Sequence, residues 1–444
     1  MYSENGWGDK DETLLQENIM ALATIDKRMR TDLKKDFGTE KDPNPEKNTQ
    51  FHNFGHFESV AVETVDLARK ALLTEGTDFE ELPYDQVIKF YSIGLVALEH
   101  DSVLVFPNSI DLRAKQVPER GLSEFQSAER VIGIFEQNGL LGNGERGGSK
   151  LSKADIYGIL GATVADIGFE TYSKDPVRVK LKINQPILFL ELEMLLENPQ
   201  LEQFEKNPYV QAYLAALPDG LNTLKEMSDE AILTAVCISN GDLRNAAGKM
   251  DSSKYLETGA ALLREERIGI VEWTRKFDEN FADATYSDLE FIIEEIFGWY
   301  SVQGDHVKYQ REVNDQIIAK LGSIENNPHL ELDTLEKVRK LRTAIAPDTR
   351  YPNFEKTAEV AETFYQELLE EFGAFALYIS KRANTGSTKI PSKFGSKHIE
   401  EMAARGPQYY SWDNLFGNPE AKEAKEAEKE ELNKLLTKTG FKTN

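Results

Sequence analysis

Residues 60–73 read VAVETVDLARKALL, and this stretch indicates the fold class. Its apolar residues recur mostly at spacings of three and four, which places them on one face of an α-helix. They are Val60, Val62, Val65, Leu67, Ala68, Ala71 and Leu72. The same spacing returns later, at Leu289, Ile292, Ile293, Ile296, Phe297 and Tyr300 and then at Val313, Ile317 and Leu321. Alternating runs typical of strands are scarce, with VRVKLKI at residues 177–183 as the one good candidate. We therefore expect an all-α protein.

The chain of 444 residues carries an acidic excess, with 52 Lys and Arg against 76 Asp and Glu and a net charge of −24. Its 40% of hydrophobic residues is enough for a sizeable core and excludes a wholly disordered chain. A negative field repels phosphate backbones and anionic lipid headgroups. We therefore expect no general nucleic-acid binding and no membrane association. A small anionic substrate would need a metal or a local basic cluster in its pocket.

The cysteine content and the first residues of the sequence both bear on the cellular compartment. Cys237 is the single cysteine, so no intrachain disulfide can form, which is typical of a reducing environment. The first residues, MYSENGWGDKDE, are polar and acidic and lack the pattern of a signal peptide. We expect a cytoplasmic protein, and its oligomeric state stays open.

Three consecutive regions are expected along the chain. Residues 1–47 form an N-terminal helical extension, with a helix over about 12–35, and residues 48–325 form the main domain. Residues 326–444 form a C-terminal helical region and charged tail. In that tail NPEAKEAKEAEKEELNKLLTK, residues 418–438, has Glu and Lys at helical spacing, which favours a solvated helix or a frayed end.

Residues that carry chemistry occur in short motifs. FHNFGH, residues 51–56, leads into the amphipathic helix above, and its two histidines are four apart, so their imidazoles can converge from one side of a helical turn. ALEHD, residues 97–101, ends an apolar segment. His100 and Asp101 at the inner end of a buried helix are costly unless something satisfies them. A divalent cation does so, because it takes neutral imidazole and ionised carboxylate together.

A further anionic ligand is offered by SNGDLRNAAG, residues 239–248, which follows the apolar helix AILTAVCI. Asp242 stands at the end of that helix, where its carboxylate could point into a cleft. The alternative interpretation is a set of unrelated polar residues at helix ends with satisfied hydrogen bonds. The presence of three such motifs in one chain favours the metal site.

In this order the motifs resemble the HD superfamily of metal-dependent phosphohydrolases. Within it they are most similar to the cyclic-nucleotide phosphodiesterase branch, whose motifs run Tyr-His-Asn-x-x-His, His-Asp and Ala-Asp-Leu-Ser-Asn-Pro. The resemblance covers roughly residues 50–250 and implies an HD-type helical domain with an N-terminal extension and a C-terminal helical region. As metal ligands it implies His56, His100, Asp101 and Asp242, with Asp101 also catalytic as a bridge between two ions. His52 would be the general acid that protonates the leaving oxygen.

Two further residues take supporting roles by the same resemblance. Glu124 in LSEFQSAE and Asp166 at the end of GATVADIGF would stand behind the ligands as supporting carboxylates. Arg113 and Lys115 are the nearest basic residues after the His-Asp motif and are candidates for holding the substrate phosphate. The family often continues as His-Asp-x-x-His-Pro-Gly-x-x-Asn, whereas residues 100–109 read HDSVLVFPNS and lack the second histidine.

The implied function is that of a metal-dependent phosphohydrolase that acts on a nucleotide or cyclic-nucleotide-like phosphoester through metal-activated water. Its cofactor would be one or two divalent metal ions, Mn, Fe, Mg or Zn, because the ligands are nitrogen and oxygen without thiolate. Two alternatives stay open. One is an HD-fold protein that binds a nucleotide or a partner without turnover, and the other is a di-iron oxygenase, since myo-inositol oxygenase resembles this arrangement.

Overall fold

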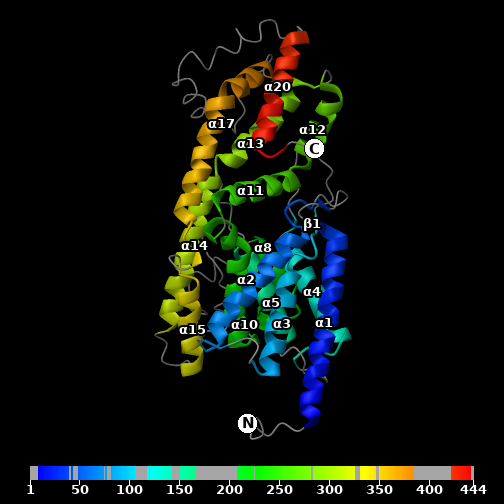
Figure 1. Cartoon of the computed structure of the whole chain (residues 1–444), viewed down its shortest axis with the longest axis vertical. Helices are drawn as coiled ribbons and strands as arrows, with labels where there is room; N and C mark the ends of the chain where they lie inside the picture. The colour runs from blue at the N-terminus through cyan, green and yellow to red at the C-terminus, as the bar shows by residue number, and fades with distance from the viewer. Residues whose placement is uncertain are drawn as a thin grey trace. The chain divides into compact units, whose positions relative to one another are not determined.

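The computed structural model describes residues 9–39, 42–43, 49–74, 76–77, 82–106, 118–119, 121–142, 151–166, 208–224, 226–249, 251–281, 284–325, 331–346, 350–383 and 422–441. Over these ranges the backbone is almost entirely helical (Figure 1). The strands among them are β1 (Gly38–Thr39) and β2 (Asp42–Pro43), which pair in antiparallel fashion. The predicted all-α class is confirmed. The strand predicted over residues 177–183 lies outside the described residues.

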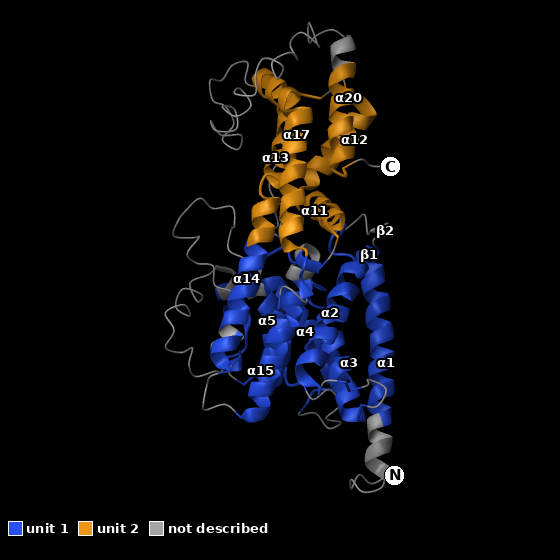
Figure 2. Ribbon diagram, turned by 60° about the vertical axis from the view of Figure 1, so that its left-hand side comes forward, with its two compact units in different colours: residues 1–107, 117–249, 309–352 blue, residues 108–116, 250–308, 353–444 orange. Residues whose placement is uncertain are grey.

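The chain divides into two compact units, and both are built from separated stretches of sequence (Figure 2). Unit 1 comprises Met1–Pro107, Val117–Lys249 and Tyr309–Pro352, and unit 2 comprises Met250–Lys308 and Asn353–Asn444, as far as these are described. Unit 1 contains α1 (Asp9–Phe37), β1, β2, α2 (Phe54–Leu72), α3 (Tyr84–Leu98), α4 (Leu122–Gln137), α5 (Lys153–Asp166), α8 (Pro208–Ala216), α9 (Leu221–Leu224), α10 (Asp229–Ser239), the π-helix η4 (Asn240–Lys249) and α15 (Leu332–Ala344). Unit 2 contains α11 (Ser252–Glu266), α12 (Ile268–Asn280), α13 (Tyr286–Tyr300), α17 (Phe354–Ala383) and α20 (Lys422–Lys438). In α14 (Gln303–Ile324), residues 303–308 belong to unit 2 and residues 309–324 to unit 1.

Helix α2 holds a central place in unit 1, because it packs against α3, α10, α15 and η4. Helix α10 also packs on α5, which in turn packs on α4. Helix α1 packs on α3. The sequence predicts three consecutive regions along the chain. In the structure the division is not consecutive, because residues 309–352 belong to the same compact unit as the first half of the chain.

The sequence of α2 explains both its start and its orientation. Asn53 caps the helix, since its side chain accepts hydrogen bonds from the first backbone N–H groups. The buried residues follow the expected helical spacing, with Val60, Leu67 and Ala68 at 1% exposure or less. Val62, in contrast, is 60% exposed and lies on the solvent face. The helix begins at Phe54, three residues before the start near Phe57 that the sequence suggested.

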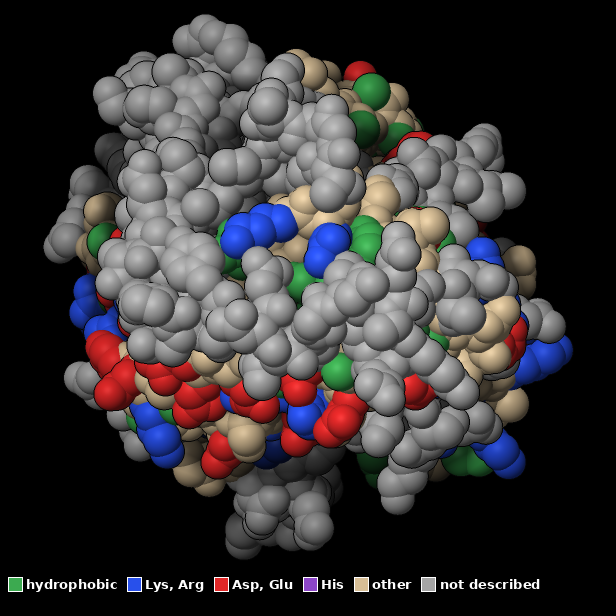
Figure 3. Space-filling model, turned by 90° about the horizontal axis from the view of Figure 1, so that it is seen from above, with side chains coloured by type: hydrophobic (Ala, Val, Ile, Leu, Met, Phe, Trp, Pro, Cys, Tyr) green, Lys and Arg blue, Asp and Glu red, His purple; other side chains and the backbone are tan. Residues whose placement is uncertain are grey.

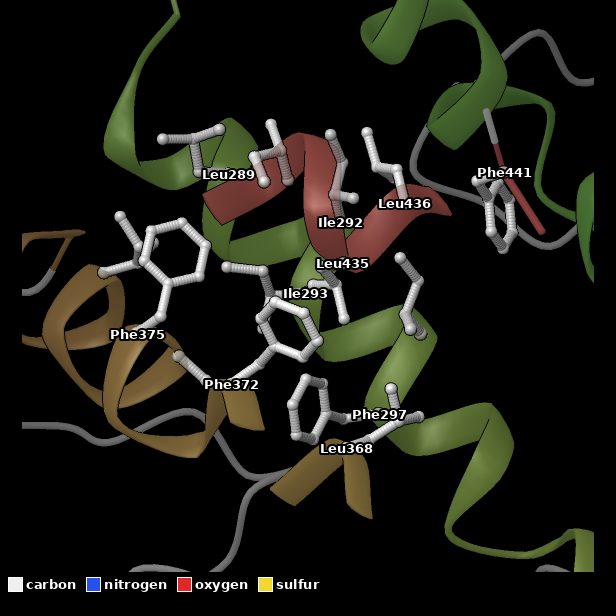
Figure 4. Packing of buried hydrophobic residues seen from close by; sticks show 14 of the residues in the cluster. Leu289, Ile292, Ile293, Phe297, Leu368, Phe372, Phe375, Leu435, Leu436 and Phe441 are labelled. Carbon is white, nitrogen blue, oxygen red and sulfur yellow. The ribbon is translucent and has the colours of Figure 1, made fainter. Parts of the chain in front are cut away.

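Unit 2 has its own hydrophobic core, in which residues of α13 and α17 face residues of α20 (Figure 4). The apolar residues predicted at 289–300 all belong to it, and each is at most 2% exposed. They are joined by an aromatic set on α17 that includes Phe372 and Phe375, both fully buried.

The C-terminal helix differs from the solvated helix or frayed end expected from its charge. In α20 the side chains of Leu432, Leu435 and Leu436 are at most 2% exposed and belong to the unit 2 core. These three leucines lie three and four residues apart, so they form one apolar face on an otherwise charged helix. Glu428 on the same helix is also buried, and its carboxylate accepts a hydrogen bond from the Tyr286 hydroxyl at 3.1 Å.

Acidic side chains are visible on one face of the structure. On the face seen in Figure 3, Asp and Glu side chains gather along one edge, with Lys and Arg side chains among them. In the part of the chain that the structure describes, no helix combines the length and apolar character that a membrane crossing requires.

A matched pair of leucines tests the core of unit 2. Leu368 is fully buried in that core, and Leu332 is 86% exposed. Leu368→Ala should lower the free energy of unfolding by about 2–5 kcal/mol, because lost burial and the residual cavity add. Leu332→Ala should change it by less than about 0.5 kcal/mol. Urea unfolding followed by circular dichroism measures both variants, and equal effects would contradict the packing in Figure 4.

Candidate metal centre

Three elements of unit 1 bring five predicted side chains together. His52 precedes α2 and His56 lies in its first turn, while His100 and Asp101 occupy the turn that follows α3. Asp242 lies in the first turn of η4, which continues directly from α10. Since α2 packs against α3, α10 and η4, the ends of these elements meet at one place.

The polar atoms of this cluster are close to one another. His100 Nε2 lies 3.0 Å from Asp101 Oδ2, 3.3 Å from His56 Nε2 and 3.8 Å from Asp242 Oδ1. His56 Nε2 lies 3.5 Å from Asp242 Oδ1 and 3.8 Å from Asp101 Oδ2. His52 stands at the edge, with its Nε2 3.6 Å from Asp101 Oδ2.

A hydrogen bond orients the most deeply buried imidazole. His100 has no exposed surface, and its Nδ1 lies 2.9 Å from the carbonyl oxygen of Ala97. A carbonyl can only accept, so Nδ1 carries a proton and Nε2 is directed at the cluster. Such a hydrogen bond behind the ring is the usual way in which a metal-binding histidine is oriented.

Aromatic rings pack against the imidazoles. Phe57 is fully buried, and its ring meets that of His100 edge to face at a centroid distance of 5.7 Å. Phe51 packs on His56 at 4.6 Å and on His52 at 4.8 Å. These contacts restrict the rotamers of all three histidines. His52, His56 and Asp101 keep 13–14% of their side-chain surface exposed, so the cluster opens to solvent on that side.

The electrostatics of the cluster favour an added positive charge. Burial by itself lowers the pKa of His100, but the Asp101 and Asp242 carboxylates outweigh it and raise this pKa to about 9. Burial lowers the pKa of His56 and raises that of Asp242. Although burial acts the other way on Asp101, the neighbouring imidazoles hold its pKa well below the usual range.

The donor set fits a divalent metal ion. The ligand atoms of His56, His100 and Asp242 all lie within 4.8 Å of one another. Ligands at about 2.0–2.2 Å from one ion are themselves about 3–4.4 Å apart, so small side-chain movements suffice to bring these atoms to ligand distance. With neutral imidazoles, the two carboxylates of Asp101 and Asp242 carry a charge that a divalent cation balances.

Of the remaining predicted site residues, the structure describes the side chain of Glu124 alone. Arg113 and Lys115 lie outside the described residues, and so does the side chain of Asp166, whose backbone ends α5. Glu124 is 2% exposed and caps α4, where its carboxylate accepts a hydrogen bond from the backbone N–H of Gly121 at 2.6 Å.

The structure adds supporting residues on α4 that the sequence analysis did not single out. Ser123, Ser127 and Arg130 lie on one face of this helix, at the spacing i, i+4, i+7. The two hydroxyls accept hydrogen bonds, at 3.0 and 3.1 Å, from the backbone of the turn that follows the His-Asp motif, residues 103–105. Arg130 Nε lies 3.1 Å from the carboxylate of buried Glu99, which directly precedes His100. Nothing in the local sequence distinguishes these residues from ordinary helix surface.

Two further residues set the positions of His56 and Asp242. The Asn53 side chain accepts hydrogen bonds from the N–H groups of Gly55 at 2.9 Å and His56 at 3.4 Å, which fixes the first turn of α2. An asparagine just before an apolar helical run is a recognisable capping signal. Gly241 brings η4 against α2, because a Cβ there would lie 3.1 Å from Thr64 Oγ1 and 3.3 Å from a backbone oxygen of α2.

Comparisons with known proteins identify no relative: no protein-family model, no curated protein and no solved structure matches the chain.

The close approach at Gly241 can be tested against another glycine of unit 1. Gly241→Ala should destabilise the protein and displace Asp242, because backbone and a fully buried threonine surround the new methyl group. Gly133→Ala, in the middle of α4 with nothing within 4 Å of the new Cβ, should instead stabilise by about 0.5–1 kcal/mol. Thermal unfolding of both variants decides the matter, and stabilisation by Gly241→Ala would show that η4 does not sit this close to α2.

Proposed function

We propose that the protein is a metal-dependent phosphohydrolase of the HD type that acts on a small nucleotide or cyclic-nucleotide-like phosphoester. The observation that carries the proposal is the arrangement around His100. Its Nε2 faces the Nε2 of His56 at 3.3 Å with Asp101 and Asp242 beside them, while a carbonyl holds its Nδ1 proton. Two imidazole nitrogens so close need a cation or a shared proton between them.

His56, His100, Asp101 and Asp242 would hold the metal, with Mn, Fe, Mg and Zn all compatible with nitrogen and oxygen ligands. When bound, such an ion supplies a water of lowered pKa and neutralises charge on a phosphoryl group. The exposed side of the cluster, at His52 and Asp101, is where a phosphoester from solvent would enter.

His52 would deliver a proton to the departing oxygen. It lies at the open edge of the cluster, and its Nε2 is 3.6 Å from Asp101 Oδ2. A general acid requires the protonated form of the imidazole.

The charge of the whole chain narrows the substrate class. A net charge of −24 disfavours binding along a polynucleotide, whereas a small phosphoester can be held by a cation inside one pocket. A cytoplasmic location, expected from the single cysteine, is part of this proposal.

Metal content of protein purified without chelator is the first test. One or two equivalents should be found in the wild type and lost in Asp101→Asn, which keeps the shape of the side chain and removes its charge. Asp155→Asn is the matched control, because Asp155 is 4% exposed and its carboxylate accepts hydrogen bonds from backbone N–H groups in another part of unit 1. Wild type that stays metal-free after reconstitution with Mn, Fe, Zn and Mg would overturn the proposal.

Turnover then separates the hydrolase from its alternatives. On a panel of phosphomonoesters, phosphodiesters and cyclic nucleotides, His52→Ala should lower the rate by about 10²–10⁴-fold and leave the metal content unchanged. Metal binding without turnover would favour a binding protein. Oxygen consumption by the iron-loaded form would favour an oxygenase.

Metal affinity should depend on pH in a defined direction. A divalent ion binds neutral imidazole, so below the pKa of about 9 it must displace the proton of His100. The apparent affinity for Mn²⁺ is therefore expected to rise by up to about tenfold per pH unit from pH 7 and to level off above pH 9. Calorimetric titration in buffers of different ionisation enthalpy measures the affinity and the released proton together. An affinity that is constant over this range would contradict the protonation of His100.

A further inference from the structure

Two adjacent residues near the end of unit 1, Arg350 and Tyr351, reach the elements that carry His56 and Asp242. Both side chains are buried, with 7% and 2% of their surface exposed. They lie more than 100 residues after Asp242 in the sequence, outside the region of family resemblance.

Arg350 binds α2. Its Nη1 donates to Asp66 Oδ2 at 2.6 Å, and its Nη2 forms a second ion pair with Glu63. Glu63 and Asp66 are one turn apart on the same helix, so the planar guanidinium bridges them with two separate N–H groups. The pairing is directional and partly removed from water, because Glu63 is 13% exposed and Asp66 is 40% exposed.

Tyr351 reaches η4. Its hydroxyl lies 3.3 Å from the backbone oxygen of Asn240 and 3.4 Å from the Oδ1 of the same residue. Asn240 is the first residue of η4, two before Asp242, and its Nδ2 in turn donates to the carbonyl of Val236 at 2.9 Å. A single phenol thus contacts the point where α10 passes into the π-helix.

The same two elements are held together at two other points. Lys249, at the end of η4, forms an ion pair with Glu63 of α2, and Gly241 permits the close approach described above. Arg350 and Tyr351 therefore complete a set of ties between α2 and η4. π-Helices are rare and are found frequently at functional sites.

We propose that Arg350 and Tyr351 are positioning residues of the metal site, which set the separation of His56 and Asp242. The inference rests on the proposed function, since it concerns the ligands of that site. His56 Nε2 and Asp242 Oδ1 lie 3.5 Å apart on two different elements, and a metal tolerates only a few tenths of an ångström of error in its ligand positions. Adjacent residues of which one binds α2 and the other contacts η4 act on metal affinity without touching the ion.

Tyr351→Phe tests this with the smallest change, since it removes one hydroxyl and keeps the packing. Its dissociation constant for Co²⁺ should rise by about tenfold or more, as for other residues that orient metal ligands. The visible absorption of bound Co²⁺, which reports coordination geometry, should change as well. Tyr300→Phe is the matched control, because Tyr300 is also 2% exposed and its hydroxyl donates to the carbonyl of Thr439 at 3.0 Å within unit 2.

A double-mutant cycle distinguishes positioning from general destabilisation. In an Asp242→Asn background, Tyr351→Phe should cost little further affinity, because the ligand through which it acts is already impaired. Equal losses in both backgrounds would overturn the proposal. Arg350→Gln should weaken Co²⁺ binding in the same way, while Arg267→Gln, which breaks the comparable Arg267–Glu295 pair of unit 2, should leave it unchanged.

The outcomes separate this inference from the proposed function. If the wild type binds Co²⁺ and Tyr351→Phe binds it with equal affinity and an unchanged spectrum, the positioning role is wrong and the metal site stands. If the wild type binds no metal at all, both proposals are wrong.

Discussion

Burial of one imidazole governs the arrangement of unit 1. His100 has no exposed surface, so both of its ring nitrogens must find partners inside the protein. The Ala97 carbonyl accepts the Nδ1 proton, and Nε2 is left to the side chains of His56, Asp101 and Asp242. The first turn of α2, the turn after α3 and the first turn of η4 therefore have to converge on one ring, although their residues are spread over nearly half of the chain.

The contacts that hold these elements in place are mostly polar and small. An asparagine caps α2, two hydroxyls of α4 bind the turn after the His-Asp motif, and a glycine lets η4 approach α2. Apolar packing brings helices together but tolerates some sliding, whereas hydrogen bonds and close backbone contacts define positions to a fraction of an ångström. A cluster of titratable groups needs the positions that hydrogen bonds and close backbone contacts define.

Local sequence patterns predicted the helices and the residues that converge, because both depend on short-range spacing. The helix expected over about 12–35 is part of α1 (Asp9–Phe37), and the three histidine and aspartate motifs meet in the structure. Their role as metal ligands stays a prediction. Residues whose partners lie far away in the sequence show no such local pattern. Leu432, Leu435 and Leu436 stand among many charges, and only the core of unit 2 explains their burial. Arg350 and Tyr351 have no motif around them at all.

The interleaving of the two units has a consequence for synthesis on the ribosome. Unit 1 needs residues 309–352, which are made only after residues 250–308 of unit 2. Until residue 350 has been made, Glu63 and Asp66 of α2 lack the Arg350 guanidinium, which lies 287 and 284 residues after them in the sequence. Without Arg350 these two carboxylates keep, among the described residues, only their pairs with Lys249 and Lys70. Unit 1 can therefore be completed only after the intervening segment of unit 2 has been made, and its folding depends on contacts between residues far apart in the sequence.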